Sequence, residues 1–278
     1  MSILLKNIHG NIGNILWRIA AGEYYRRSHD MDEMILLIRS DLDYQRYMSV
    51  FRWMGWDYRV IRSESEMKGV RFVQFRQQLK INTKYVPLPD VRKAENFWFS
   101  GANESPQFFG GDRMFAQHLF PAITDNGLLT DEVLGLYPEI DFDGIVSINV
   151  RRGDKMALQD KYVIPSAGWI RRAMDRFTGC MFLFTSDDIS WCRREFGNDP
   201  RCLFADRITD NFPKWLIDLR LQTLCRHNII SNSTFSWWGA YLNCHTDRKV
   251  IYTLPWYRHR TPSQTDSIPL GDGWEVVQ

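Results

Sequence analysis

The chain has 278 residues, of which 44% are hydrophobic and 14% are aromatic, and its formal net charge is +2. This composition supports a packed core in one large domain or in two domains of moderate size, and it excludes a disordered chain. The charge is too balanced for the basic stripe of a typical nucleic-acid-binding protein, so we expect no nucleic acid among the partners.

The five cysteines all lie in the second half of the chain, and no two of them form a CxxC pair. An odd number without this spacing disfavours a disulfide framework or a zinc site and favours reduced, buried thiols. No apolar run near Met1 is long enough for a signal peptide, and no later run is long enough to span a bilayer. We therefore expect a cytoplasmic location, with peripheral contact to the inner face of the membrane left open.

The first half of the chain opens as a strand, a turn, a helix and a second strand. Apolar runs at 3–5 and 34–38 predict the strands, and apolar residues at helical spacing over 15–20 predict the helix. The turn between them is Gly10-Asn11-Ile12-Gly13-Asn14, which has neither the spacing of a dinucleotide fingerprint nor the lysine of a P-loop. Further segments are predicted as strands at 58–61 and 70–75 and as a helix at 112–123.

The same alternation begins again after Pro138. Apolar runs predict strands at 145–150, 181–184, 229–230 and 249–253, and helical spacing predicts a helix over 215–226. Apolar strands that alternate with helices are typical of a doubly wound parallel sheet. We expect an α/β fold with two lobes that meet at about residue 140, and one large sheet is the alternative.

Polar residues follow the predicted strands, at the edge of a parallel sheet where ligands bind. The first such group is Arg151-Arg152-Gly153-Asp154. A guanidinium group binds phosphate oxygens in a bidentate manner and keeps its charge at any working pH. Because neighbouring strand residues face opposite sides, we expect one arginine to bind an anion and the other to be anchored. Asp154 would orient an arginine or act as a base, and a surface turn with a salt bridge is the alternative.

Two more groups of this kind follow later strands. Residues 231–239 read Ser-Asn-Ser-Thr-Phe-Ser-Trp-Trp-Gly and predict a capped helix N-terminus, which suits a diphosphate, although an ordinary cap is the alternative. Trp237 and Trp238 are either core residues or platforms for a sugar. Asp187 and Asp188 are contiguous carboxylates that point apart, so they favour a hydrogen bond to a nucleotide, or a strand-end cap, over a metal site. No histidine has the spacing of a metal ligand, and no serine has the setting of a hydrolase nucleophile.

Together these segments resemble the α-1,2-fucosyltransferases, family 11 of the glycosyltransferases, along nearly the whole chain. Residues 225–240 are similar, almost letter for letter, to the family block Cys-x-His-Asn-Ile-Ile-x-Asn-Ser-Thr-Phe-Ser-Trp-Trp-Gly-Ala. Residues 149–154 resemble its His-x-Arg-Arg-Gly-Asp motif, and 186–188 resemble a strand that ends in Ser-Asp-Asp. Residues 10–15 resemble the loop Gly-Gly-x-Gly-Asn-Gln, which is weak on its own.

The resemblance implies a GT-B-like fold with two Rossmann-like lobes, parallel sheets and the active site in the cleft between the lobes. Residues 1–140 would form the lobe on the acceptor side, and residues 141–278 would bind GDP-fucose. The implied reaction is an inverting transfer of L-fucose from GDP-β-L-fucose to a hydroxyl of a glycan acceptor, with O2 of a β-galactoside as the receiving atom. No metal or other cofactor is implied. The acceptor would be a free galactoside or a lipid-linked oligosaccharide.

The resemblance also assigns roles to individual residues. Arg151 would hold the diphosphate and stabilise the leaving GDP, and Asp154 and Asn14 complete the implied catalytic set. The residues implied in donor binding are Asn149, Arg151, Arg152, Asp187, Asp218, Ser233, Thr234 and Phe235. Gly10, Gly13 and Asn14 would form a loop near the fucose and the acceptor.

The sequence departs from the family pattern at a few positions. Asn149 replaces the usual His and keeps the ability to donate and accept hydrogen bonds, Lys155 lies where Tyr is frequent, and Asn11 and Ile15 replace Gly and Gln. The alternatives are another GDP-sugar transferase or a protein O-fucosyltransferase, and a non-catalytic nucleotide- or glycan-binding homologue, which Asn149 motivates. An RNA-binding protein is motivated only by the slight excess of basic residues and the aromatic content.

Overall fold

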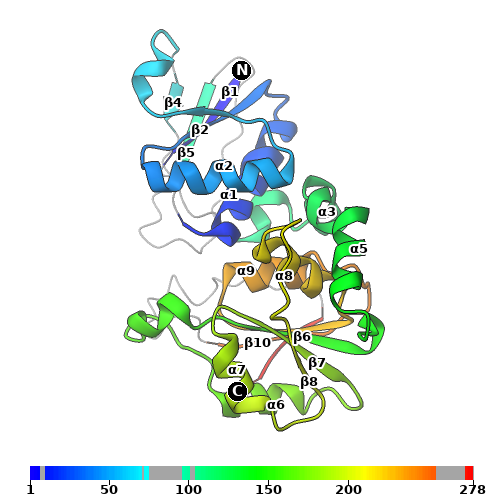
Figure 1. Ribbon diagram of the computed structural model, residues 1–278. Helices are drawn as coiled ribbons and strands as arrows, with labels where there is room; N and C mark the ends of the chain where they lie inside the picture. The colour runs from blue at the N-terminus through cyan, green and yellow to red at the C-terminus, as the bar shows by residue number, and fades with distance from the viewer. Residues whose placement is uncertain (7–9, 71, 75–95, 101–103, 255–272, 278) are drawn as a thin grey trace. The chain divides into compact units, whose positions relative to one another are not determined.

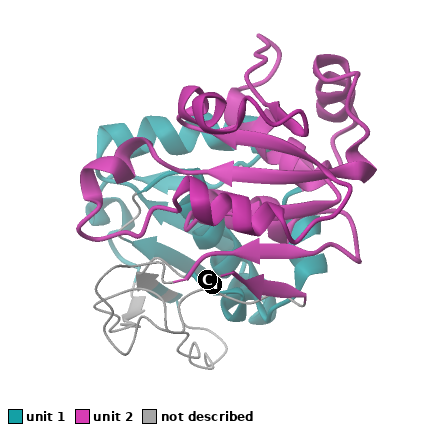
Figure 2. Ribbon diagram, turned by 90° about the horizontal axis from the view of Figure 1, so that it is seen from below, with its two compact units in different colours: residues 1–120, 261–269 teal, residues 121–260, 270–278 magenta. Residues whose placement is uncertain are grey.

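The computed structural model describes residues 1–6, 10–70, 72–74, 96–100, 104–254 and 273–277. The chain divides into two compact units (Figure 2). Unit 1 comprises the described residues up to Phe120, and unit 2 comprises those from Pro121 onward. Each unit contains its own parallel sheet.

Unit 1 is built on a five-stranded parallel sheet with the strand order β3-β2-β1-β5-β4 (Figure 1). Its strands are β1 (Ser2–Lys6), β2 (Glu33–Leu37), β3 (Arg59–Ile61), β4 (Phe72–Gln74) and β5 (Asn96–Ser100). Its helices are α1 (Ile12–Ser28), α2 (Asp41–Met54) and α3 (Arg113–Leu119), with 3-10 turns η1 (Glu64–Met67) and η2 (Pro106–Phe109). The helix α2 begins at Ser40, whose side chain accepts a hydrogen bond from the backbone of Asp43, and it ends at Gly55 in the left-handed region.

Unit 2 contains a six-stranded parallel sheet with the order β11-β10-β9-β6-β7-β8. The strands are β6 (Ile145–Val150), β7 (Met181–Ser186), β8 (Cys202–Phe204), β9 (His227–Ile230), β10 (Val250–Tyr252) and β11 (Trp274–Val276). The helices are α4 (Pro121–Thr124), α5 (Gly127–Leu136), α6 (Ala167–Met174), α7 (Ile189–Phe196), α8 (Lys214–Leu224) and α9 (Thr234–Tyr241), with η3 (Phe142–Gly144) and η4 (Gly153–Leu158).

The central strand β6 is buried along its whole length, and its two faces differ in chemistry. Val146, Ile148 and Val150 join a hydrophobic cluster with α6 and α7 on one face of the sheet. Ser147 and Asn149 alternate with them, as the two-residue period of a strand requires. The helices α8 and α9 cover the opposite face (Figure 1). The sheet is therefore covered on both faces, as in doubly wound proteins.

The doubly wound parallel architecture predicted from the sequence is confirmed, and the alternative of one large sheet is wrong. Three strands were not predicted, namely β5, β8 and β11. β8 and β11 are only three residues long, but β3, β4 and β10 have the same length and were predicted, so length alone does not explain the difference. Positions 71 and 75 of the expected strand at 70–75, and the expected strand end near Pro255, lie outside the described residues.

The units divide at residues 120 and 121, whereas the sequence analysis placed the lobe boundary at about 140. The helices α4 and α5 belong to unit 2 because Arg220 of α8 connects them to it. Its guanidinium donates to the backbone oxygens of Ile123 (3.1 Å) and Thr124 (2.9 Å) and to the hydroxyl of Thr130 (2.7 Å). These hydrogen bonds join residues that are far apart in the sequence, so no local sequence pattern predicts them.

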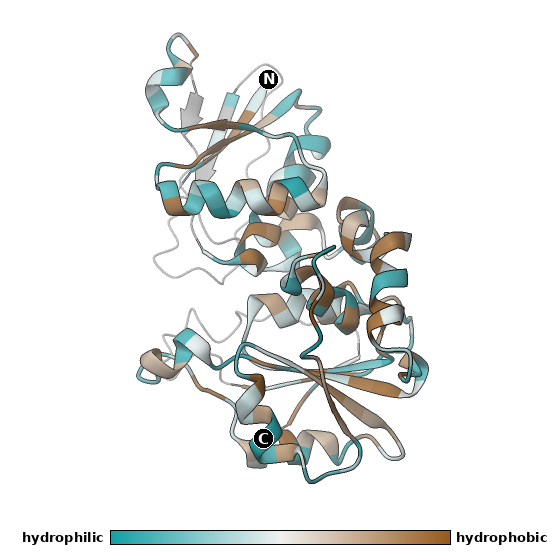
Figure 3. Cartoon of the chain, in the orientation of Figure 1, coloured by the Kyte–Doolittle hydropathy of each residue, from teal (hydrophilic) through white to brown (hydrophobic). Residues whose placement is uncertain are grey.

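No described helix is long and apolar enough to cross a membrane. Helices such as α2 and α5 mix hydrophilic and hydrophobic residues along their length (Figure 3). None of the five cysteines forms a disulfide; Cys192 and Cys225 are buried, while Cys244 is exposed, contrary to the expectation that all are buried. Burial raises the pKa of the Cys192 thiol to about 11.

Candidate active site

The carboxyl ends of β6, β7 and β9 lie side by side, because β6 pairs with both of the other strands. The polar groups that follow these strands therefore meet at one edge of the sheet of unit 2. We call the charged residues gathered there the strand-end cluster. It consists of Arg151, Arg152, Asp154, Lys155, Asp187 and Asp188.

Arg151 lies at the centre of this cluster. Its guanidinium donates to Oδ1 of Asp154 (2.7 Å) and to the carboxylate of Asp187, and its backbone N–H donates to Oγ of Ser231 (3.3 Å). The side chain is 27% exposed, so it is fixed by two carboxylates and still open to solvent. Each carboxylate receives one hydrogen bond from a different guanidinium nitrogen, and a phosphate could accept from both nitrogens at once.

Arg152 is the anchored arginine. Its guanidinium lies over the ring of Trp191, 4.1 Å from the centroid, and its Nε donates to Asp188 (3.4 Å). One arginine is anchored as expected, and anion binding by Arg151 stays a prediction, but the expected reason for the difference is wrong. Both arginines lie beyond the end of β6 at Val150. They therefore differ because they bind different partners, and not because neighbouring strand residues face opposite sides.

The two neighbouring aspartates have different partners, as expected for carboxylates that point apart. Asp188 caps α7 by accepting from the backbone N–H of Trp191 (3.1 Å). Asp187 accepts from the backbone N–H of Arg152 (2.8 Å) and from the guanidinium of Arg151. A Cβ atom on Gly153 would lie 2.3 Å from Oδ2 of Asp187, so only glycine fits at this position without displacing the carboxylate.

The N-terminus of α9 borders the cluster and differs from the expected capped end. Ser233 occupies the N-cap position but its side chain makes no capping hydrogen bond, so that part of the prediction is wrong. The hydroxyl that bonds locally belongs to Ser236, which donates to the backbone oxygens of Ser231 (3.1 Å) and Ser233 (3.0 Å). Thr234 and Phe235 are half-buried in the first turn.

Trp237 and Trp238 are core residues, with exposures of 1% and 0%. Trp237 stacks on Tyr241 with ring centroids 4.4 Å apart. The alternative that these two rings bind a sugar is therefore wrong. Their burial fixes against the sheet the part of α9 that follows its first turn.

Lys155 is a member of the cluster that sequence reasoning did not assign to the site. Its ammonium group donates to the backbone oxygen of Asn232 and, at 3.2 Å, to the side-chain oxygen of that residue. The same group lies 4.7 Å from the centre of the Tyr162 ring. Asn232 in turn donates to the backbone oxygen of Val163. These contacts join segments 77 and 69 residues apart, so no local pattern predicts them.

Asn149 lies within β6, near the strand-end cluster. Its Nδ2 donates to Oγ1 of Thr185 on β7 (2.9 Å), and its backbone oxygen accepts from the N–H of Ser231 (3.2 Å). The side chain is buried. Asn149 therefore ties together the ends of the three strands whose loops form the cluster.

Asp218 lies on α8, and no hydrogen bond or ion pair described for the chain connects it to the strand-end cluster. Its carboxylate pairs with the ammonium of Lys214 one turn earlier. Burial raises the pKa of Asp218 to about 6, and Lys214 opposes this shift. From the sequence, Asp218 was expected among the donor-binding residues. In the structure it lies on α8, close enough to Tyr137 to add to the rise in pKa that burial causes in that side chain.

The predicted loop of unit 1 is only partly a loop, because α1 begins at Ile12 and Asn14 lies in its first turn. Gly10 has a φ of 107°, and a Cβ atom there would lie 3.0 Å from Cβ of Asn14, so glycine is required by both conformation and space. Asn14 donates from Nδ2 to Oε1 of Glu104 (2.6 Å). Gly13 is buried in the first turn of α1. Glu104 was missed because it follows β5, a strand that the sequence did not predict.

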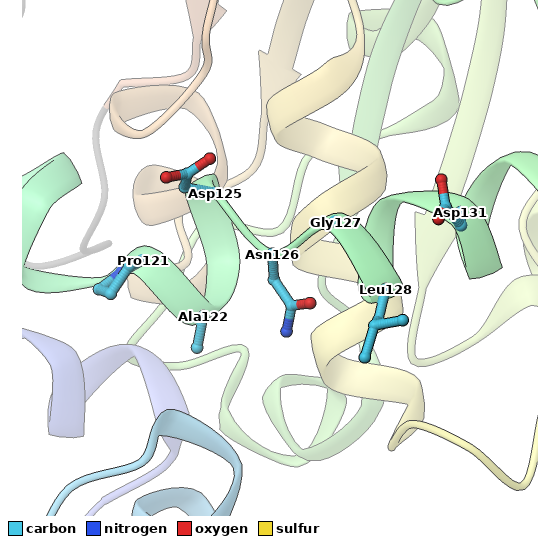
Figure 4. A pocket seen from close by; sticks show the side chains of 7 residues that line it. All are labelled: Pro121, Ala122, Asp125, Asn126, Gly127, Leu128 and Asp131. Carbon is cyan, nitrogen blue, oxygen red and sulfur yellow. The ribbon is translucent and has the colours of Figure 1, made fainter.

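A further pocket on unit 2 is open and lies on the α4–α5 segment (Figure 4). Its lining includes Ala122, Asp125, Leu128 and Asp131. None of the residues predicted for the site lines it. Within the described residues, no group of three or more His, Cys, Asp or Glu side chains is placed to hold a metal ion.

Unit 2 places an arginine and a helix N-terminus at the end of its central strand, where ligands bind in parallel α/β sheets, and comparisons with known proteins specify the family. The model of glycosyl transferase family 11 matches residues 129–267, which include the strand-end cluster and α9. The chain belongs to glycosyltransferase family 11 and is a glycosyltransferase.

Relatives and solved structures agree with this assignment. The chain is 26% identical to an α-1,2-colitosyltransferase of Escherichia coli, in a match that covers 97% of each chain. It is 35% identical over 124 residues to a galactoside 2-α-L-fucosyltransferase of Bos taurus, which is 41% of this chain and 33% of that relative. The α-1,6-fucosyltransferase NodZ, in a crystal soaked with GDP-fucose, matches with a TM-score of 0.53 at 14% identity and covers 86% of this chain and 92% of its own. The fold is therefore GT-B-like, with two Rossmann-like units.

Proposed function

We propose that this protein transfers L-fucose from GDP-β-L-fucose to a hydroxyl of a glycan acceptor, with inversion at the transferred carbon. The receiving atom is O2 of a β-galactoside, either free or at the end of a lipid-linked oligosaccharide. The observation that carries the proposal is the position of Arg151, at the end of the central strand β6 and bonded through its backbone to Ser231 before α9. Relatives named as galactoside fucosyltransferases support the sugar and the linkage.

The strand-end cluster would act on the leaving group. In the transfer, the bond between C1 of fucose and the β-phosphate oxygen breaks, and its electron pair stays on that oxygen. Arg151 stabilises the growing negative charge, and Asp154 orients the guanidinium through the 2.7 Å hydrogen bond. The acceptor oxygen forms the new bond to C1 from the opposite face, and its proton passes to solvent.

Other residues would hold the donor in place. The backbone N–H groups of Thr234 and Phe235 and the hydroxyls of Ser233 and Thr234 suit the diphosphate, because a helix N-terminus presents donors and a partial positive charge. Arg152 and Asp187 fix Arg151 and its loop, and Asn149 and Asp218 serve the nucleoside side. With these groups the diphosphate charge is stabilised by the protein itself, so we propose that the reaction needs no metal or other cofactor.

The loop of unit 1 would serve the fucose and the acceptor. Asn14 is held by Glu104 at 2.6 Å, and Gly10 provides the space for its side chain. A carboxamide and a carboxylate fixed to each other present both donors and acceptors to sugar hydroxyls.

A second donor is favoured by one observation. The colitosyltransferase match covers 97% of both chains, whereas the fucosyltransferase match covers 41% of this one. Colitose is 3-deoxy-L-fucose, so the two donors differ by one hydroxyl group. A site that hydrogen-bonds this hydroxyl would reject the deoxy sugar strongly, and a site that packs against the 3-position would not.

The test is a transfer assay with GDP-fucose and GDP-colitose as donors, β-galactosides as acceptors and NMR assignment of the product linkage. An α-1,2-fucoside formed faster than the colitoside supports the proposal. Faster colitosyl transfer would assign the second donor, and a product with another linkage would contradict the proposed receiving atom. Retained activity in EDTA is expected, and loss of activity that Mg²⁺ or Mn²⁺ restores would contradict the metal-free mechanism.

A further inference from the structure

Lys155 connects the two loops that the proposed donor site depends on. The loop after β6 carries Arg151, and the turn Ser231-Asn232-Ser233 leads into α9. Lys155 extends from the first loop and donates two hydrogen bonds to Asn232 in the turn. Asn232 is buried and is fixed from its other side by the backbone oxygen of Val163. A shift of Lys155 would therefore move the first turn of α9 relative to Arg151.

The charge of Lys155 matters as much as its hydrogen bonds. In the strand-end cluster, three basic side chains face three carboxylates. Arg151 and Arg152 are matched against Asp154, Asp187 and Asp188, so the cluster without Lys155 would have one excess negative charge. Such a site would repel a diphosphate, whereas the balanced cluster leaves the helix N-terminus free to attract it.

We propose that Lys155 is a positioning residue for the diphosphate of the donor, and this inference rests on the proposed function. It sets the distance between the Arg151 guanidinium and the N-terminus of α9, and it balances the carboxylates of the cluster. Because it acts on the phosphates, its contribution grows with the number of phosphates in the ligand. The nucleoside part of the ligand does not depend on it.

The experiment measures the affinities of GDP, GMP and guanosine for the wild-type protein and for Lys155→Met, Lys155→Gln and Lys155→Arg by competition with a fluorescent GDP analogue. Lys161→Met is the matched control, since Lys161 is an exposed lysine a few residues further along the same loop. Lys155→Met and Lys155→Gln should weaken GDP about tenfold, as expected for a lost charge-assisted contact. Guanosine should bind unchanged, Lys155→Arg should retain most of the affinity for GDP, and Lys161→Met should behave as the wild type.

Each outcome decides the inference. Unchanged GDP affinity in both neutral variants would overturn it, and so would an equal loss for GDP and guanosine, which indicates a general structural role. If Lys155→Met does not fold, Lys155→Gln decides in its place, with guanosine affinity as the check on folding. A wild-type protein that binds guanosine and GDP equally, or neither, would instead contradict the proposed function and remove the basis of this inference.

Discussion

At the scale of single residues, the site depends on close approaches that only particular side chains allow. The carboxylate of Asp187 reaches both arginines because Gly153 has no Cβ atom in its way. Asp187 cannot move freely to make room, since it is held by the backbone of Arg152 as well as by the Arg151 side chain. The Arg-Arg-Gly-Asp motif therefore meets a packing requirement at Gly153 and also supplies charged side chains.

Gly153→Ala should lower the free energy of unfolding, because the new methyl group must displace the Asp187 carboxylate. Overpacking of this kind costs about 1–3 kcal/mol. Gly135→Ala is the matched control, since a Cβ atom at this position in α5 meets nothing within 4 Å, and it should stabilise the protein by about 0.5–1 kcal/mol. Urea unfolding of both variants checks this. Equal stability of the two variants would show that the contact with Asp187 has no energetic weight.

A second residue with a measurable signature is Asp218, whose pKa burial raises from 3.8 to about 6. The folded state then binds more protons than the unfolded state between these two values, so the contribution of Asp218 to stability falls as pH rises through this range. Asp218→Asn removes the titration, and it should gain stability relative to the wild type between pH 4 and 6.5. Urea unfolding of both proteins at several pH values measures the difference. A difference that does not change with pH would refute the raised pKa.

At the scale of elements, buried side chains decide which helix belongs to which unit. Arg220 is buried on α8 and satisfies the C-terminal carbonyls of α4 and the hydroxyl of Thr130 on α5. Burial lowers the pKa of its guanidinium. Arg220 therefore attaches α4 and α5 to unit 2, and Asn211 adds a hydrogen bond to Glu132 of α5 (2.9 Å).

Arg220→Met should destabilise the protein by about 2 kcal/mol, because it leaves the carbonyls of Ile123 and Thr124 without their donor. Arg194→Met, on the exposed side of α7, is the control and should change little. Thermal unfolding followed by circular dichroism compares the two. A smaller loss of stability in Arg220→Met than in the control would mean that the hydrogen bonds only offset the cost of burying the guanidinium charge.

At the scale of the whole molecule, the sequence was informative where a feature is local. The apolar run at 145–150 coincides with β6, and the runs near 3–5 and 34–38 lie within or beside β1 and β2. The partners of Lys155, Asn14 and Arg220 are 77 to 97 residues away, so their roles depend on the folded chain and cannot be derived from spacing.

The measurement that tests the central claim most directly is the turnover of Arg151→Lys with GDP-fucose and a β-galactoside, compared with the wild type at saturating donor. Lysine keeps the charge but loses the bidentate fork, so kcat should fall roughly a hundredfold, or about 3 kcal/mol, with a smaller change in donor KM. Unchanged thermal unfolding would show that the variant is folded. Wild-type kcat in a folded Arg151→Lys protein would contradict the claim that Arg151 stabilises the departing diphosphate.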